Sequence, residues 1–139
     1  MKIIVDLNVI IDFLNKRANH KEAARIVDLS LNNIIDAYLC AHEITTLSYF
    51  LHKESKDRSK VKNTIEKLMT IFRIIPINKE ILDNALNSEI QDYEDSVIEV
   101  SAIDNQCDFI VTQNIRDFKK SRIKPLSSSQ FLVLLNQLH

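Results

Sequence analysis

Four acidic residues of this chain stand where a folded protein can gather them into one site. Asp6 directly follows an apolar run, and Glu43 comes two residues after a second predicted strand. Asp117 lies in the loop after a later strand, and Asp95 lies near the start of the helix that leads into that strand. In parallel α/β sheets, ligands bind outside the carboxyl ends of the strands. We therefore expect the four carboxylates to converge at that edge of the sheet.

Carboxylates that are held together without a counter-charge repel one another and raise each other's pKa. A hard divalent cation among them removes that penalty, and oxygen ligands of this kind favour Mg²⁺ or Mn²⁺ over softer metals. Such an ion activates a water molecule and stabilises charge that develops on a phosphoryl group. The pattern therefore predicts a metal-dependent enzyme that acts on phosphate esters.

Each acid also has a structural explanation when it is taken alone. Asp6 is a typical helix cap, and Asp95 fits the third helical position of a capping box with Asp92. Glu43 is well placed to interact with the positive end of its own helix, and Asp117 fits an exposed loop. The prediction of a shared site therefore depends on all four acids together.

The third acid has to be chosen from three neighbours. Asp92 is best placed as the helix cap, because the apolar pattern starts just after it. Asp95 shares a helical stripe with Ile98 and Ala102, and this stripe can face the sheet. Glu94 points about 100° away from Asp95. We therefore expect Asp95 to be the ligand, Asp92 to be structural and Glu94 to be dispensable.

The elements that would position these acids alternate along the chain. Apolar runs predict strands at residues 2–5, 36–41, 72–75, 109–112 and 124–126. Helical spacing of apolar residues predicts helices at 8–17, from a cap at Asn19 to Leu31, and at 43–54, 57–70, 78–90, 92–106 and 128–138. This order predicts an α/β protein, a single domain over residues 1–139, with a three-layer α/β/α fold and a central, mostly parallel sheet of four to five strands.

The chain contains no glycine, so turns that need a positive φ must use other residues. Asn and Asp tolerate that conformation best. The predicted turns of this kind are Asn32-Asn33 and Asp104-Asn105.

The net charge of −1 does not by itself indicate a nucleic-acid-binding protein. The residues that follow Asp117, however, form a local basic cluster: Lys119, Lys120, Arg122 and Lys124. This cluster either contacts RNA phosphates or is solvated surface. Arg116 either contacts RNA phosphates as well or pairs with Asp117.

No stretch approaches the roughly 20 apolar residues of a membrane span, and the apolar run after Lys2 is too short for a signal peptide. Cys40 and Cys107 lie in apolar settings beside predicted strands and form no Cys-x-x-Cys pattern. We expect both to be buried, reduced thiols in a cytoplasmic protein that does not contact a membrane.

The segments that hold the four acids are together similar to the PIN domain family, and specifically to the VapC-like toxin nucleases of bacterial toxin–antitoxin pairs. The similar segments are residues 4–12, 41–44, 92–96 and 108–118, and the last is the most distinctive. The resemblance covers essentially the whole chain, because the blocks occur in the family's order and spacing.

The resemblance implies an endoribonuclease that depends on Mg²⁺ or Mn²⁺, a cognate antitoxin that inhibits it, and a homodimer. It assigns the four acids as metal ligands and gives supporting roles to Asn8, Thr112 and Asn114. Two departures affect this comparison. The family often has glycine where this chain has Asn105-Gln106, and the family's fourth acidic position varies, so Asp117 is the least secure ligand.

Rival functions fit the sequence less well. A phospho-accepting receiver domain needs an acceptor Asp after its third strand, where this chain has Pro76-Ile77-Asn78. A haloacid-dehalogenase-type phosphatase needs a second Asp two residues after Asp6, and Asn8 stands there. The remaining alternative is a catalytically inactive PIN-like scaffold that binds protein or RNA, and the presence of all four acids argues against it.

Overall fold

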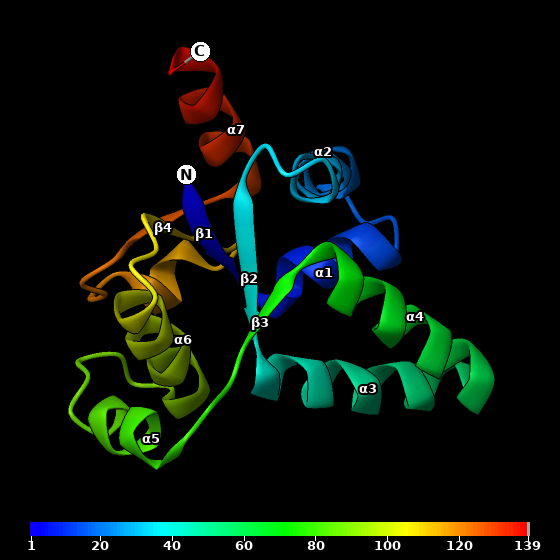
Figure 1. The fold of residues 1–139 in the computed structure, drawn as a ribbon, viewed down its shortest axis with the longest axis horizontal. Coiled ribbons are helices and arrows are strands. Elements are labelled where there is room, and N and C mark those ends of the chain that lie inside the picture. The colour runs from blue at the N-terminus through cyan, green and yellow to red at the C-terminus, as the bar shows by residue number, and fades with distance from the viewer. Residues whose placement is uncertain (139) are drawn as a thin grey trace.

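The computed structural model describes residues 1–138, which form alternating strands and helices (Figure 1). The elements, in chain order, are β1 (Lys2–Val5), α1 (Leu7–Leu14), α2 (His20–Leu31), β2 (Asp36–Cys40), α3 (Ala41–Ser55), α4 (Arg58–Ile71), β3 (Arg73–Ile75), α5 (Lys79–Ala85), α6 (Tyr93–Asp104), β4 (Phe109–Val111), the 3₁₀ helix η1 (Ile115–Phe118), β5 (Lys124–Leu126) and α7 (Ser128–Gln137).

All five strands are parallel and lie in the order β3-β2-β1-β4-β5, so the predicted α/β fold is confirmed. The chain first builds the sheet outward from β1 to β3 and then returns to the other side of β1 with β4. The topological switch point therefore lies between β1 and β4, where Val5 pairs with Val111. In open parallel sheets this is the position at which a ligand site forms.

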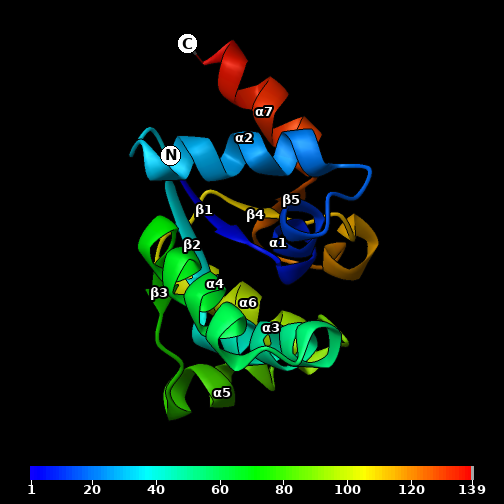
Figure 2. The same cartoon turned by 90° about the vertical axis from the view of Figure 1, so that its right-hand side faces the viewer.

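Helices cover both faces of the sheet (Figure 2). Ile3 and Val5 pack into a core cluster with residues of α1, α2, α4 and α7, while Ile4 packs into a second cluster with Ile98 of α6. The alternation along β1 follows from the two-residue period of a strand. Both faces of the sheet are therefore buried, and its carboxyl edge is left for polar side chains.

The helix predicted at 78–90 is shorter in the structure and ends at Ala85. The Ser88 hydroxyl accepts the N–H of Ile90 at 3.1 Å, and Ile90 turns into the second core cluster. The prediction of a longer helix was wrong because these contacts divert the chain from a helical path.

Four residues among 1–138 take the positive φ that glycine would favour, namely Lys16, Asn33, Lys56 and Gln106. The prediction of a turn at Asn32-Asn33 is confirmed at Asn33. The turn predicted at Asp104-Asn105 was wrong by one residue, because Asn105 ends α6 with φ −99° and Gln106 takes φ 57°. Gln106 therefore occupies the left-handed position that often follows a helix.

Cys40 and Cys107 are free and buried, as predicted. No helix in residues 1–138 is long and apolar enough to cross a membrane.

Replacing Gln106 with Gly should stabilise the protein. The left-handed conformation costs a residue with a Cβ atom about 1–2 kcal/mol, and glycine loses about half of that gain through its greater unfolded-state entropy. We expect the free energy of unfolding in urea to rise by about 0.5–1 kcal/mol. The matched control is Asn105→Gly, which should lower stability because φ at Asn105 is already negative. Equal effects at both positions would contradict this explanation.

Candidate active site

Asp6 lies at the carboxyl end of β1 and joins the two strands of the switch point. It is the N-cap of α1, and its Oδ1 accepts the N–H of Leu7 at 2.8 Å. Its Oδ2 accepts the hydroxyl of Thr112 at 2.8 Å and the side-chain amide of Asn8 at 3.0 Å. Thr112 directly follows β4. The carboxylate of Asp6 is therefore held in place from both strands.

The loop after β4 is fastened to the start of α1 by the same groups. The N–H of Gln113 donates to Asn8 Oδ1 at 3.1 Å, and the N–H of Asn114 donates to Thr112 Oγ1 at 3.0 Å. Asn8 and Thr112 thus lie against Asp6, as the supporting roles require. Asn114 contributes a backbone group, and its side chain is exposed.

Glu43 is buried at the first turn of α3, with 3% of its surface exposed. Its Oε1 accepts the N–H of Cys40 at 2.9 Å, which closes a capping box at the end of β2. Its Oε2 is also buried and has no hydrogen-bond partner in residues 1–138. A buried carboxylate oxygen without a partner is costly and calls for a ligand.

The three neighbouring acids at the start of α6 differ in their contacts and exposure. Asp92 is the N-cap, and its Oδ1 accepts the N–H of Asp95 at 3.1 Å. Asp95 is half-buried on the side of the helix that faces the sheet edge, whereas Glu94 is exposed. The structural role expected for Asp92 is therefore confirmed.

Asp117 is exposed on η1, in the segment after β4. Its N–H donates to the carbonyl of Asn114 at 3.0 Å. The next residue, Phe118, is fully buried in the cluster that contains Ile98 of α6. This anchor holds the carboxylate of Asp117 on the side of the molecule where α6 begins.

The electrostatics show that these carboxyls lie within each other's field. Burial raises the pKa of Asp6, and the charge of Asp117 raises it further. Burial also lifts the pKa of Glu43 well above its ordinary value, with added contributions from Asp6 and Asp95. Burial, followed by the charge of Asp6, raises the pKa of Asp95 to about 7. The charges of the four acids singled out in the sequence therefore act on one another at this edge of the sheet.

The residues present fit a divalent cation in their chemistry. No three His, Cys, Asp or Glu side chains in the described part of the chain are already spaced to hold a metal ion. The unpartnered Oε2 of Glu43, however, is an acceptor without a donor, and burial together with the neighbouring acids disfavours the charged forms of Glu43 and Asp95. A divalent cation would accept a bond from the free oxygen of Glu43 and would offset the negative charge of the cluster, if the side chains moved to coordinate it.

A cavity of about 400 Å³ opens beside Asp95 and Asp117. Its cationic lining consists of Arg116, Lys119 and Lys120. A polyanion that entered the cavity would meet these cations next to the acids.

Arg122 is not among the residues that line this cavity. Its guanidinium instead donates to Glu99 at 3.2 Å. Glu99 was not singled out from the sequence. The available signal was an acidic residue between Ile98 and Val100, at a position of the predicted helix where neighbouring residues are apolar. It lies four residues after Asp95, on the same stripe of α6.

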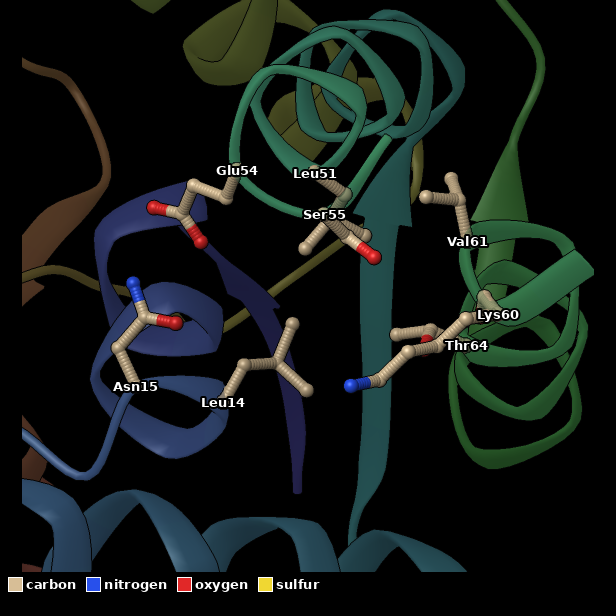
Figure 3. A pocket seen from close by; sticks show the side chains of 8 residues that line it. All are labelled: Leu14, Asn15, Leu51, Glu54, Ser55, Lys60, Val61 and Thr64. Atoms are coloured by element: carbon tan, nitrogen blue, oxygen red, sulfur yellow. The ribbon is translucent and has the colours of Figure 1, made fainter. Parts of the chain in front are cut away.

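A second cavity of about 350 Å³ lies between α1, α3 and α4, at the far end of α1 from Asp6 (Figure 3). Leu14, Leu51 and Val61 give it apolar walls, and Glu54 and Lys60 are its charged residues. It contains none of the four acids, so the chemistry of the side chains places the candidate active site at the sheet edge.

A family model described as "PIN domain" matches residues 2–116. The chain is also 31% identical over 143 residues to Ribonuclease VapC1 of Aquifex aeolicus (strain VF5), which covers 99% of this chain and 97% of that protein. Both findings agree with the resemblance carried by the four acidic segments.

Solved structures with the same fold include toxin–antitoxin complexes. VapBC2 from Rickettsia felis, bound to a DNA fragment from its promoter, matches with a TM-score of 0.72 and 18% identity over 91% of this chain and 98% of that chain. VapBC-1 from nontypeable Haemophilus influenzae matches with a TM-score of 0.68 and 15% identity over 93% and 99%. At these identities the matches show a shared fold.

The raised pKa of Asp95 predicts a loss of stability with rising pH when no metal is bound. Between its ordinary value of 3.8 and the folded value of about 7, the unfolded chain gives up the proton while the folded protein keeps it. Stability from this group is therefore complete below pH 3.8 and lost as the pH approaches 7. We therefore expect the free energy of unfolding of Asp95→Asn, relative to that of the parent protein, to be greater at pH 8 than at pH 5. The measurement is urea unfolding in EDTA at the two pH values.

The control is Asp104→Asn, because Asp104 is exposed at the other end of α6. Its effect on stability should be the same at both pH values. A stability difference between Asp95→Asn and the parent protein that does not change with pH would contradict the raised pKa of Asp95.

Proposed function

Because the chain belongs to the PIN domain family, we propose that it is a divalent-metal-dependent endoribonuclease that hydrolyses RNA phosphodiester bonds and serves as the toxin of a toxin–antitoxin pair. The family match over residues 2–116 and the 31% identity to a ribonuclease support the nuclease assignment. The toxin–antitoxin complexes among the structures with the same fold support the biological context.

The observation that supports this function most directly is the unpartnered Oε2 of Glu43, a carboxyl whose pKa is raised by burial and further by the charges of Asp6 and Asp95. Asp6, Glu43, Asp95 and Asp117 would hold Mg²⁺ or Mn²⁺ there. The bound ion would activate water and stabilise negative charge on the phosphate. A binding protein without catalysis would have no need to bear the cost of this repulsion.

The remaining residues of the site position groups and bind substrate. Asn8 and Thr112 hold the Asp6 carboxylate in one orientation, and the backbone of Asn114 in turn holds Thr112. Arg116, Lys119 and Lys120 line the adjacent cavity and would bind RNA phosphates on either side of the scissile bond.

We propose the same partners as the toxin–antitoxin context implies. These are an RNA substrate, a cognate antitoxin protein that blocks the site, and a second copy of the chain in a homodimer. We place the protein in the cytoplasm, where an RNA substrate is present, and treat residues 1–139 as one nuclease domain.

The central test of this function is metal-dependent cleavage of single-stranded RNA. The protein should cleave RNA in Mg²⁺ or Mn²⁺ and stop in EDTA. Asp6→Asn and Asp95→Asn should each lower kcat by about 100-fold or more, because a catalytic metal supplies several kcal/mol of transition-state stabilisation. Glu94→Gln is the matched control and should stay near the parent rate, because its side chain is exposed.

Two results would contradict the assignment. Cleavage that continues in EDTA with Asp6→Asn fully active would remove the metal-dependent mechanism. Full activity of Asp95→Asn with loss of activity in Glu94→Gln would show that the catalytic register on α6 is one residue off. Circular dichroism of each variant confirms that it is folded.

A further inference from the structure

Glu99 is a buried carboxylate that lies beside the candidate site but is not part of the acid cluster. Only 1% of its surface is exposed. Its Oε2 accepts the backbone N–H of Arg122 at 2.7 Å, and its Oε1 accepts the Ser88 hydroxyl at 2.7 Å and the Arg122 guanidinium at 3.2 Å. Every polar atom of this buried side chain is therefore satisfied by donors from two loops.

These donors keep Glu99 ionised inside the protein. Burial would raise its pKa, but the N–H of Arg122, the Ser88 hydroxyl and the guanidinium together hold the pKa below its ordinary value. Hydrogen bonds to a charged group are about twice as strong as those between neutral groups. Removing the charge of Glu99 would therefore release both loops at once.

One of the two loops, which connects α5 to α6, forms a wall of the 400 Å³ cavity. Ser88 donates to Glu99 and accepts the N–H of Ile90 at 3.1 Å. Ile90, Gln91 and Asp92 line the cavity directly. The bond to Glu99 thus fixes the base of this wall.

The other loop, between η1 and β5, bears the lysines of the cavity. Phe118 is buried at its start, and Arg122 is bound by Glu99 at its end. Lys119 and Lys120 lie between these two anchors, are exposed, and make no ion pair within residues 1–138. Their positive charges are therefore free for a ligand, while that of Arg122 is already neutralised.

Helix α6 sets the distance between these lysines and the acids. Asp95 and Glu99 are four residues apart, so they lie on the same face of the helix, one turn from each other. The acid that lies beside the metal-binding cluster and the group that holds the lysine loop are therefore parts of one rigid element.

We propose that Glu99 is a positioning residue that holds Lys119 and Lys120 at the mouth of the cavity, where they bind the phosphate next to the scissile bond of a single-stranded RNA. This inference rests on the proposed ribonuclease function. Arg122 takes part by fastening the loop to Glu99, and the phosphate is bound by the two lysines.

The test is Glu99→Gln, which keeps the shape of the side chain but cannot accept all three bonds. KM for RNA should rise about tenfold, while kcat changes less than about twofold, because lost phosphate binding weakens the substrate complex and leaves the acids in place. In a Lys119→Ala/Lys120→Ala background the same substitution should leave KM unchanged, since Glu99 acts through those lysines. Asp104→Asn, an exposed acid of the same helix, is the control and should change neither constant.

A second measurement does not depend on activity. Amide hydrogen exchange at residues 119–123 should accelerate at least about tenfold in Glu99→Gln, while exchange at residues 79–85 of α5 stays the same. Arg122→Gln keeps the backbone bond and should give intermediate exchange, which preserves the test if Glu99→Gln does not fold.

The proposal is overturned if exchange at 119–123 is unchanged, or if Glu99→Gln raises KM by the same factor with and without the lysines. The second result would show a general structural role. Parent protein that cleaves no RNA in Mg²⁺ or Mn²⁺ would overturn the proposed function, and the exchange measurement would still decide whether Glu99 holds the loop.

Discussion

The burial and mutual repulsion of the carboxylates of Asp6, Glu43 and Asp95, at the carboxyl edge of the sheet, is the constraint on which the rest of this structure depends. Burial raises the pKa of Glu43, the charges of Asp6 and Asp95 raise it further, and its buried Oε2 has no hydrogen-bond partner in residues 1–138. Apolar side chains or paired charges at these positions would make the folded protein more stable. The parallel sheet, with its switch point between β1 and β4, instead places these carboxylates near one another. The burial of apolar side chains in the surrounding core offsets the free-energy cost of the cluster.

Each acid is used for structure and for chemistry at the same time. Asp6 caps α1 with Oδ1 and is oriented by Thr112 through Oδ2, while Glu43 closes a capping box with Oε1 and leaves Oε2 free. The structural and functional explanations for these residues are therefore compatible, because a carboxylate has two oxygens. The helix caps fix the positions of the acids without using all of their capacity to accept a ligand. This division explains how a small chain can hold several like charges close together in a defined arrangement.

The sequence was sufficient to predict the parallel α/β fold, the acids that converge and the choice of Asp92 as a cap, because these follow from apolar periodicity and chain order. Other features depend on contacts between distant segments. The early end of α5 follows from the bonds of Ser88, and the left-handed residue after α6 was displaced by one position to Gln106. Glu99 was missed because its partners lie 11 and 23 residues away in the chain. Local pattern does not encode such contacts, and they shape the wall of the site.

The most direct test of the central claim is the number of protons released when Mn²⁺ binds, measured by titration calorimetry in two buffers of different ionisation enthalpy. A cation that enters a cluster of partly protonated carboxyls must displace protons. With the pKa of Asp95 at about 7, this group should release about one proton per ion at pH 6, and its contribution should fall as the pH rises above 7. Binding without proton release at pH 6, or no binding of Mn²⁺, would contradict the account of a repulsive carboxylate cluster that a metal ion stabilises.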